Sequence, residues 1–289
     1  MYTAHAWQDY ELIDTGDGEK LERWGSVTLR RPDPQVIWKK SAPDEWRKAD
    51  ASYTRSETGG GAWEFVRKVP ESWTMRYGEL SFTVRPTGFK HTGLFPEQAA
   101  NWDWVVSLIR NAGRPIRVLN LFAYTGGATL AAASAGARVT HVDAAKGMVQ
   151  WAKENYKLSG LAEDSARWII DDALAFVLRE ARRGNKYDAV IMDPPSYGRG
   201  PDGSMWKLER DLFGFCEACR NVLSDTPLFL LISSYTTGLQ PIAIANVMSR
   251  AFRIPFGSIH ANELALPVTS GGLLPAGSAC RWENEKLMV

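Results

Sequence analysis

The first third of the chain alternates apolar and polar residues at the two-residue period that is typical of β-strands. The strand-like segments are short and rich in aromatic and branched side chains, and glycine, proline and aspartate separate them. These segments cover residues 10–16, 20–31, 35–40, 62–69, 73–78 and 80–88. The pattern predicts a β-rich domain over residues 1–92, a candidate substrate-recognition module.

The period changes to that of a helix just after this domain. Pro96 can open a helix, because proline fits the first helical turn. Trp102, Val105 and Ile109 then repeat at helical spacing. We therefore place the start of a second domain, residues 93–289, in this segment.

Strands and helices alternate through most of the second domain. Apolar, strand-like runs occupy residues 116–122, 138–144, 167–172, 187–195 and 228–235. Helix-like runs follow them at residues 128–136, 146–160, 173–184, 206–223 and 240–252, and the tail holds segments 259–268 and 278–283. The alternation predicts an α/β fold with right-handed crossovers and a parallel, doubly wound sheet.

The composition narrows the class of protein. The 289 residues are 45% apolar but contain no apolar run long enough to cross a bilayer, so we expect no membrane partner. The N-terminal stretch lacks the basic start and apolar run of a secretory signal, so we expect a cytoplasmic protein. The net charge of +1 gives no global field that attracts nucleic acid.

The twelve tryptophans have two interpretations. They could stack on nucleic-acid bases, or they could fill the thin core of a small β-domain. We favour the core, because large aromatic side chains are mostly buried in folded proteins.

The three cysteines, Cys216, Cys219 and Cys280, cannot all pair within one chain. No second cluster of cysteine and histidine lies nearby to complete a zinc site. We therefore expect reduced thiols and no metal.

Ligands of an open α/β sheet bind beyond the carboxyl ends of its strands. We call the position where the chain leaves the carboxyl end of a strand an exit. At the first exit, Gly126 and Gly127 could let a cofactor approach the backbone, or they could serve a tight turn for conformational reasons alone. At the second exit, Asp143 lies at the distance from these glycines at which a carboxylate binds a ribose diol. A helix N-cap is the alternative role for Asp143, and a cap could coexist with ribose binding.

The third exit supplies two adjacent carboxylates, Asp171 and Asp172. One can accept a hydrogen bond from an adenine amino group while the other caps the following helix, and the sequence does not say which. At the fourth exit, Pro194 and Pro195 form a rigid turn that aims Asp193 and the Pro194 carbonyl outward, toward a substrate amine or ring edge. An ordinary strand-ending turn is the alternative.

Two stretches, "VLNLFAYTGGATLAAASAGARVTHVDAAKGMVQWAKENYKLSGL" and "YDAVIMDPPSYGRG", resemble the class I S-adenosylmethionine-dependent methyltransferases. More narrowly, they resemble bacterial 23S ribosomal RNA methyltransferases, a group with cytosine carbon-5 and guanine nitrogen enzymes. The likeness runs from about Leu94 to about Tyr235. It implies a seven-stranded, mostly parallel Rossmann-like methyltransferase sheet with a smaller β-rich N-terminal domain.

The resemblance also implies roles for individual residues. The cofactor would be bound by Gln98, Asn120, Phe122, Tyr124, Thr125, Gly126, Asp143, Ala144, Asp171, Asp172, Ala173 and Asp193. The target base would face the catalytic residues Asp193, Pro194, Pro195 and Tyr197. The segment around Gln98, "FPEQ", departs from the "FLDQR" and "FLDHR" forms of the family, which puts the role of Gln98 in doubt.

Enzymes that methylate cytosine carbon-5 first add a cysteine thiolate to the ring, and related proteins carry that cysteine where this chain has "LISSYTTG". Ser233 and Ser234 are poor substitutes, because an alkoxide lies far above a thiolate in pKa. Cys216 and Cys219 fit a buried helix face better than a catalytic site. A nitrogen target needs no covalent intermediate.

We therefore predict an enzyme that transfers a methyl group from S-adenosylmethionine to a base nitrogen of ribosomal RNA, as a monomer or homodimer. Tyr197 could stack on the base, and Arg199, Lys207 and Arg210 either hold phosphates or form a solvated face. Two alternatives remain: a methyltransferase for a protein or small-molecule acceptor, and a nonenzymatic RNA-binding protein that keeps the cofactor fold.

Overall fold

The computed structural model divides the chain into two units, which we call the α/β unit and the β unit. The structure describes residues 1–56, 60–88, 90–199, 203 and 205–284. The α/β unit comprises Met1–Tyr2, Asn101–Leu264 and Gly277–Val289, and the β unit comprises Thr3–Ala100 and Ala265–Ala276. The domain boundary predicted between residues 92 and 93 lies inside the β unit.

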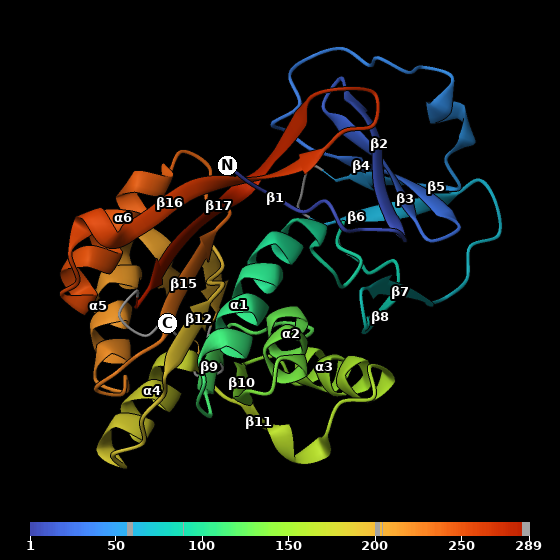
Figure 1. Cartoon of the computed structure of the whole chain (residues 1–289). Helices are drawn as coiled ribbons and strands as arrows, with labels where there is room; N and C mark the ends of the chain where they lie inside the picture. The colour runs from blue at the N-terminus through green and yellow to red at the C-terminus, as the bar shows by residue number, and fades with distance from the viewer. Residues whose placement is uncertain (57–59, 89, 200–202, 204, 285–289) are drawn as a thin grey trace. The chain divides into compact units, whose positions relative to one another are not determined.

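An eight-stranded sheet forms the centre of the α/β unit (Figure 1). Its order is β1-β16-β17-β15-β12-β9-β10-β11. The bounds are β1 Tyr2–Thr3, β9 Arg117–Leu121, β10 Arg138–Asp143, β11 Ala166–Ile170, β12 Ala189–Met192, β15 Phe229–Ser234, β16 Ile259–Pro267 and β17 Leu273–Glu283. Strands β11, β10, β9, β12 and β15 are parallel, and β17 is antiparallel to β15.

The mostly parallel sheet confirms the predicted fold class, although it has one strand more than the seven expected. The extra strand is β1, whose two residues are too few to leave a periodic pattern in the sequence. Strands β12 and β15 are buried along their whole length, as expected for parallel strands that helices cover on both faces.

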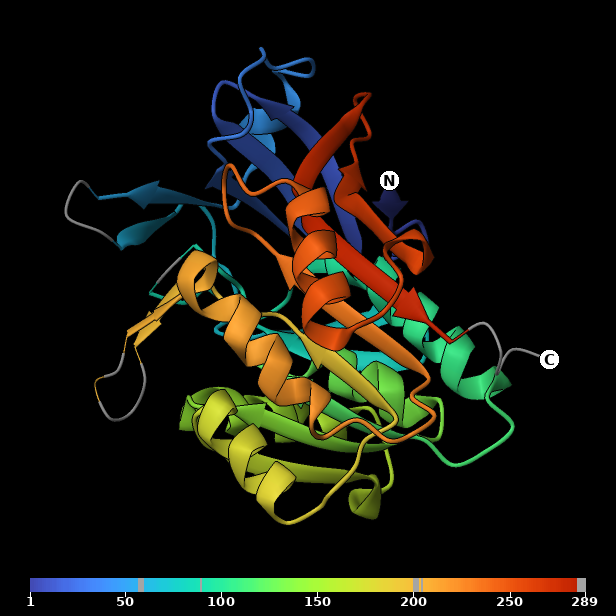
Figure 2. The ribbon, with the colours of Figure 1, turned by 90° about the vertical axis from the view of Figure 1, so that its left-hand side faces the viewer.

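Within the described residues, six α-helices flank this sheet. They are α1 Ala99–Asn111, α2 Gly127–Ser134, α3 Lys146–Leu158, α4 Ala173–Arg182, α5 Leu208–Arg220 and α6 Pro241–Phe252. Helices α4, α5 and α6 share one apolar core with alternate residues of the strands, including Leu119 and Leu121 of β9. Figure 2 shows α5 and α6 in front of the sheet. The intervening residue, Asn120, bonds to Thr129 of α2 and so faces the opposite side.

The segment between β12 and α5 differs from the prediction. Strands β13 Tyr197–Arg199 and β14 Met205–Lys207 pair as an antiparallel ribbon, and the helix predicted from residue 206 begins at Leu208. Trp206 pairs across this ribbon with Gly198 and packs against Phe215 of α5. Its aromatic contact therefore favours a strand at this position over an earlier helix start.

The β unit contains a five-stranded sheet of order β2-β3-β4-β5-β6 and a separate two-stranded sheet, β7-β8. The bounds are β2 Tyr10–Gly16, β3 Glu19–Trp24, β4 Val27–Pro32, β5 Ala51–Arg55, β6 Gly61–Phe65, β7 Trp73–Tyr77 and β8 Leu80–Val84. The part of the chain that the structure describes also has four short 3-10 helices: η1 Glu45–Lys48, η2 Pro96–Gln98, η3 Glu163–Ser165 and η4 Phe256–Ser258. The predicted strand at 35–40 is wrong, and β5 was not predicted.

Residues 265–276 belong to the β unit although they follow the α/β unit in sequence. Val268 forms a bridge to Leu12 of β2, and the amide N of Thr269 donates to the Leu12 carbonyl at 2.8 Å. The Ser270 hydroxyl also binds the carboxylate of buried Asp14. This pairing joins residues more than 250 positions apart, so sequence periodicity could not reveal it.

A buried ion pair and a tryptophan form part of the interior of the β unit. Two guanidinium nitrogens of Arg31 donate to the two oxygens of Glu22 at 2.6 and 2.7 Å, and the guanidinium lies 5.2 Å from the Trp24 ring centroid. Burial raises the pKa of Glu22, but Arg31, Lys20 and the hydrogen bond from Tyr10 together outweigh burial and lower this pKa to about 2. Trp24 and Trp46 are both buried, which agrees with tryptophans that fill a core.

Candidate functional site at the strand tips

The carboxyl ends of four neighbouring strands form one row, which we call the strand-tip site. Leu121 pairs with Met192 on one side and with Val142 on the other, and Asp143 pairs with Ile170. The exits of β12, β9, β10 and β11 are therefore level with one another and span about three strand spacings, or about 14 Å. The chain runs from β9 to β10 and β11 in one direction and then continues at β12 on the other side of β9, so a topological switch point lies between β9 and β12.

The loop after β9 has an unusual backbone. Phe122, Tyr124 and Gly126 have φ values of 56°, 50° and 92°, in the left-handed region that residues other than glycine rarely adopt. Such conformations concentrate at functional sites, where surrounding contacts hold them. One of these contacts is the amide N of Tyr124, which donates to Oδ2 of Asp143 at 2.8 Å.

Asp143 connects the first two exits. Its Oδ1 accepts from the amide N of Ala145 at 2.8 Å, so each carboxylate oxygen holds one backbone amide. The N-cap residue of α3 is Ala145 and not Asp143, so the helix-cap interpretation of Asp143 is wrong. Burial raises the pKa of Asp143, and its two backbone hydrogen bonds lower it, with burial the larger effect. Ala144, beside it, is exposed.

The two glycines of the loop have a conformational and packing explanation. A Cβ atom on Gly126 would lie 3.0 Å from the Ala152 side chain, in addition to the strained φ. A Cβ atom on Gly127 would lie 2.5 Å from the Trp102 ring. Both glycines are therefore required by contacts within the protein, whether or not a ligand lies nearby.

Two residues of the predicted cofactor loop are held inside the protein. Asn120 is 2% exposed, and its Nδ2 donates to the Thr129 hydroxyl, which also contacts His141 Nδ1 at 2.9 Å. Thr125 is equally buried, and its carbonyl accepts from Asn155 Nδ2 at 3.0 Å. Asn120 and Thr125 are therefore held by hydrogen bonds within the protein.

The structure separates the roles of the two carboxylates after β11. Asp172 is the N-cap of α4, and its Oδ1 accepts from the amide N of Ala175 at 2.8 Å. Asp171 forms an ion pair with Arg179, and its Oδ1 accepts from the amide N of Asp172. The helix cap, which the sequence left open, therefore belongs to Asp172.

Replacing Asp172 with alanine is expected to lower the free energy of unfolding by about 1 kcal/mol, because the cap bond to Ala175 is lost. Asparagine caps helices as well as aspartate, so Asp172→Asn is expected to stay close to the wild type. Urea unfolding of the two variants measures the difference. An equal loss in both variants would contradict the cap assignment.

The turn after β12 is fixed at several points. The amide N of Asp193 donates to the Leu121 carbonyl at 3.3 Å, which ties this exit to β9. Pro194 is buried, whereas Pro195 and Ser196 are exposed. The Ser196 hydroxyl accepts from Thr236 at 2.7 Å, so the turn is also joined to the loop that follows β15.

Trp206 was not among the predicted site residues, but it contacts the turn after β12 and the loop after β9. Its indole Nε1 donates to the Pro195 carbonyl at 2.7 Å, and its ring centroid lies 5.3 Å from that of Phe122. Only the aromatic character of residue 206, close to the predicted turn, could have indicated this contact.

The ribbon that follows the turn carries the residues predicted to hold RNA. Tyr197 is 63% exposed, and Arg199 and Lys207 are exposed. Tyr197 and Lys207 are cross-strand partners, so their side chains lie on the same face of the ribbon. Arg210 instead pairs with Asp211 at 2.7 Å, which makes it a poorer candidate for a phosphate contact.

The three cysteines are buried. Burial raises the pKa of the Cys216 and Cys219 thiols strongly, and it raises the pKa of Cys280 to about 12. At the end of β15, Ser233 and Ser234 are 1% and 3% exposed. None of these five residues offers an accessible thiolate at the strand tips.

Gln98 lies in the β unit, in η2, and is buried. Pro96 occupies the first position of η2, directly before α1, so the predicted helix opening is confirmed. The role of Gln98 toward a cofactor stays a prediction.

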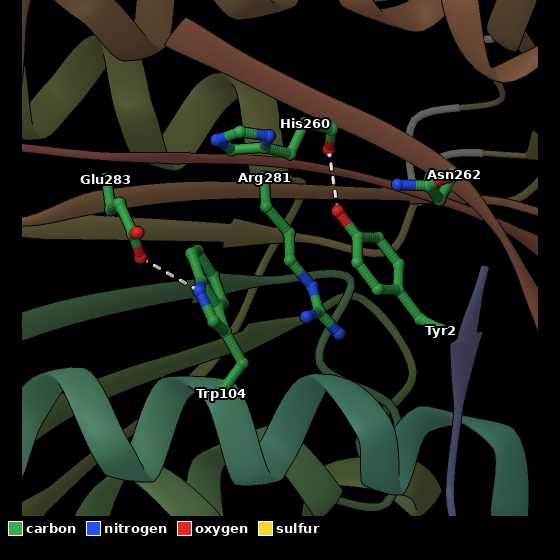
Figure 3. A pocket seen from close by; sticks show the side chains of 6 residues that line it. All are labelled: Tyr2, Trp104, His260, Asn262, Arg281 and Glu283. Atoms are coloured by element: carbon green, nitrogen blue, oxygen red, sulfur yellow. Dashed lines mark hydrogen bonds between the residues drawn. The ribbon is translucent and has the colours of Figure 1, made fainter.

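A pocket of 340 Å³ lies elsewhere in the α/β unit (Figure 3). Its lining residues are Tyr2, Trp104, His260, Asn262, Arg281 and Glu283. The Arg281 guanidinium lies 3.6 Å from the Tyr2 ring centroid and 5.1 Å from that of Trp104, and burial lowers its pKa to about 10. Trp104 Nε1 donates to Glu283 at 3.0 Å. None of the predicted site residues lines this pocket.

The described residues contain neither a metal-binding cluster nor a membrane-spanning helix. Within residues 1–56, 60–88, 90–199, 203 and 205–284, no three histidine, cysteine, aspartate or glutamate side chains are grouped so that they could hold a metal ion. No helix in the same ranges is both long and apolar enough to span a membrane.

Comparison with known proteins identifies the family of this fold. The sequence profile of a family described as S-adenosylmethionine-dependent methyltransferase matches residues 54–214. The crystal structure of a SAM-dependent methyltransferase from Agrobacterium tumefaciens superposes with a TM-score of 0.92. The two sequences are 38% identical, and the match covers 98% of this chain and 92% of the other.

Curated relatives match a smaller part of their own length. The ribosomal RNA large subunit methyltransferase K/L of Shewanella frigidimarina is 35% identical over 147 residues, which are 50% of this chain and 20% of that protein. The protein of the same name from Syntrophotalea carbinolica is 29% identical over 212 residues, which are 73% of this chain and 27% of that protein. This chain therefore spans about a quarter or less of these two relatives.

Proposed function

The chain belongs to the S-adenosylmethionine-dependent methyltransferases, and on that premise we propose that it methylates a nitrogen atom of a ribosomal RNA base. The observation that carries the proposal is the level row of strand tips, in which Asp143 and Asp193 lie on either side of the switch point between β9 and β12.

The strand-tip residues fit a donor that contains a ribose and an adenine. Each oxygen of Asp143 holds one amide and keeps a second lone pair for a ribose hydroxyl, which a carboxylate can only accept from. The small, exposed Ala144 leaves room beside it. In this proposal Asp172, which caps α4 through Oδ1, and Ala173 would also flank the adenine at the next exit, as the family resemblance implies. When bound, S-adenosylmethionine supplies an electrophilic methyl group on a sulfonium.

Asp193 holds the acceptor in this proposal. Its carboxylate accepts a hydrogen bond from the N–H of the target nitrogen, which directs the nitrogen lone pair toward the methyl group, and it takes up the proton that this nitrogen loses when it is methylated. The two prolines after it fix the turn, which favours a single orientation of the acceptor. Much of the rate enhancement of methyl transfer then comes from holding the acceptor nitrogen in position.

The cysteines support a nitrogen target over carbon 5 of cytosine. The carbon reaction requires a thiolate that adds to the ring, and all three thiols are buried with a raised pKa. A base nitrogen needs no such nucleophile.

The outer face of the β13-β14 ribbon supports an RNA acceptor. In this proposal Tyr197 stacks on an extruded base, and Arg199 and Lys207 contact phosphates on the same face of the ribbon. The two curated relatives described above carry ribosomal RNA in their names, which agrees with this acceptor.

Labelling with radioactive cofactor tests the acceptor. Total RNA and total protein from a strain that lacks this enzyme are incubated separately with it and the labelled donor. We expect label in the large ribosomal RNA, with binding that weakens steeply as salt is added. Label in the protein fraction alone, or RNA binding that does not respond to salt, would contradict the proposal.

A further inference from the structure

Trp206 contacts both sides of the strand-tip site. Its indole Nε1 donates to the carbonyl of Pro195, in the turn after β12, at 2.7 Å. Its ring also forms a triangle with Phe122 and Phe215, with centroid distances of 5.3 Å, 5.6 Å and 5.4 Å. One side chain thus joins the loop after β9 to the turn after β12.

The contact with Phe122 has a conformational consequence. Phe122 has a φ of 56°, and a residue other than glycine keeps this conformation only where its surroundings hold it. Trp206 and Phe215 are aromatic neighbours that pack against the Phe122 ring. They therefore stabilise the shape of the loop that carries Tyr124 and its bond to Asp143.

The contact with Pro195 fixes the other side of the site. Pro195 has no freedom in φ, so a hydrogen bond to its carbonyl determines the plane of the next peptide. The amide N of Leu208, two residues after Trp206, donates to the Ser196 carbonyl at 3.0 Å. The segment that carries Trp206 therefore holds two successive carbonyls of the turn that begins at Asp193.

We propose that Trp206 is a positioning residue that fixes the cofactor loop and the acceptor turn relative to each other. The effect of Trp206 on the acceptor turn rests on the proposed function. Its effect on the cofactor loop rests only on the family to which the chain belongs. Trp206 itself touches neither reactant in this account. It acts through the Pro195 carbonyl and through Phe122.

Trp206→Phe separates the two contacts, because it removes the indole N–H and keeps an aromatic ring against Phe122. We expect kcat for RNA methylation to fall by about tenfold, the usual cost of one lost hydrogen bond. The dissociation constant for S-adenosylhomocysteine, measured by calorimetry, is expected to stay within about twofold of the wild type, since the ring contact remains. If Trp206 contributed to packing alone, Trp206→Phe would not lower kcat while leaving cofactor affinity unchanged.

Trp206→Leu removes the ring as well, and we expect about a tenfold loss of affinity for S-adenosylhomocysteine in addition to the lower kcat. Trp104→Phe is the matched control, because it removes another indole N–H of the same unit, the one bonded to Glu283 (Figure 3). This control is expected to keep the wild-type kcat and affinity. Thermal unfolding shows whether each variant is folded.

The proposal is overturned if Trp206→Phe keeps the kcat of the wild type, or loses no more than Trp104→Phe does. It is also overturned if a folded Trp206→Leu protein binds S-adenosylhomocysteine as the wild type does. If Trp206→Leu does not fold, the kcat of Trp206→Phe decides. Failure of the wild type to methylate RNA counts against the proposed function alone, because the cofactor titration needs no acceptor.

Discussion

Replacing Asp193 with asparagine is expected to lower kcat by about 100-fold or more, which corresponds to about 2.7 kcal/mol of transition-state stabilisation. Asparagine has nearly the same size but carries no negative charge, so it cannot stabilise the positive charge that develops on the methylated nitrogen. Affinity for S-adenosylhomocysteine is expected to change far less than kcat, because the acceptor and not the ribose depends on this carboxylate. Steady-state kinetics and calorimetry measure the two quantities.

Asp225→Asn is a suitable control for this experiment, because Asp225 lies in an exposed turn before β15. It is expected to keep the wild-type kcat. Asp193 has no catalytic role if an Asp193→Asn or Asp193→Ala protein binds cofactor normally and transfers methyl groups as fast as the wild type.

Replacing Asp143 with alanine is expected to weaken cofactor binding by about tenfold or more, because two ribose hydroxyls lose their acceptor. The amides of Tyr124 and Ala145 also lose their partners, so the loop after β9 is less well held. Asp143→Asn is expected to weaken binding as well, because the asparagine NH₂ group is a donor and would face one of these two backbone N–H donors. Calorimetry with S-adenosylhomocysteine is the direct measurement, and unchanged affinity would contradict the ribose role.

Cofactor affinity is also expected to depend on pH through Asp143. Burial raises the pKa of this carboxyl above its ordinary value of 3.8, and only the ionised form accepts from both amides and both hydroxyls. Affinity is therefore present at neutral pH and is lost as the pH falls through the raised pKa. In the Asp143→Ala variant, cofactor affinity should no longer fall as the pH is lowered. If it still falls over the same pH range, a group other than Asp143 causes the decrease.

The positions of the four strand ends could be predicted from the sequence because parallel strands have a regular pattern of apolar residues. The apolar runs of β10, β11 and β12 end at aspartates, and the run of β9 is followed by a loop with two glycines. The level register of β12, β9, β10 and β11 then brings the four exits together. Asp143 and the turn at Asp193 could be located in this way. The roles of Asp171 and Asp172 could not, because the choice between cap and ion pair depends on Arg179 and on the local backbone.

Other features depend on contacts that leave no local pattern. The ribbon strands β13 and β14 have three residues each, which is too short for an alternation to be recognised, so Trp206 was assigned to a helix. The hairpin at 265–276 belongs to the β unit through a bridge to Leu12, far away in sequence. Asn120 lies in a cofactor-like motif, but its partner Thr129 on α2 determines which way its side chain points.

The most direct test of the account is the chemical position of the transferred methyl group. Ribosomal RNA from a strain that lacks this enzyme is methylated in vitro, digested to nucleosides and analysed by mass spectrometry against synthetic standards. We predict a single nucleoside methylated on a base nitrogen, which the wild type forms and the Asp193→Asn variant does not. A methyl group on carbon 5 of cytosine, or on a protein, would contradict it.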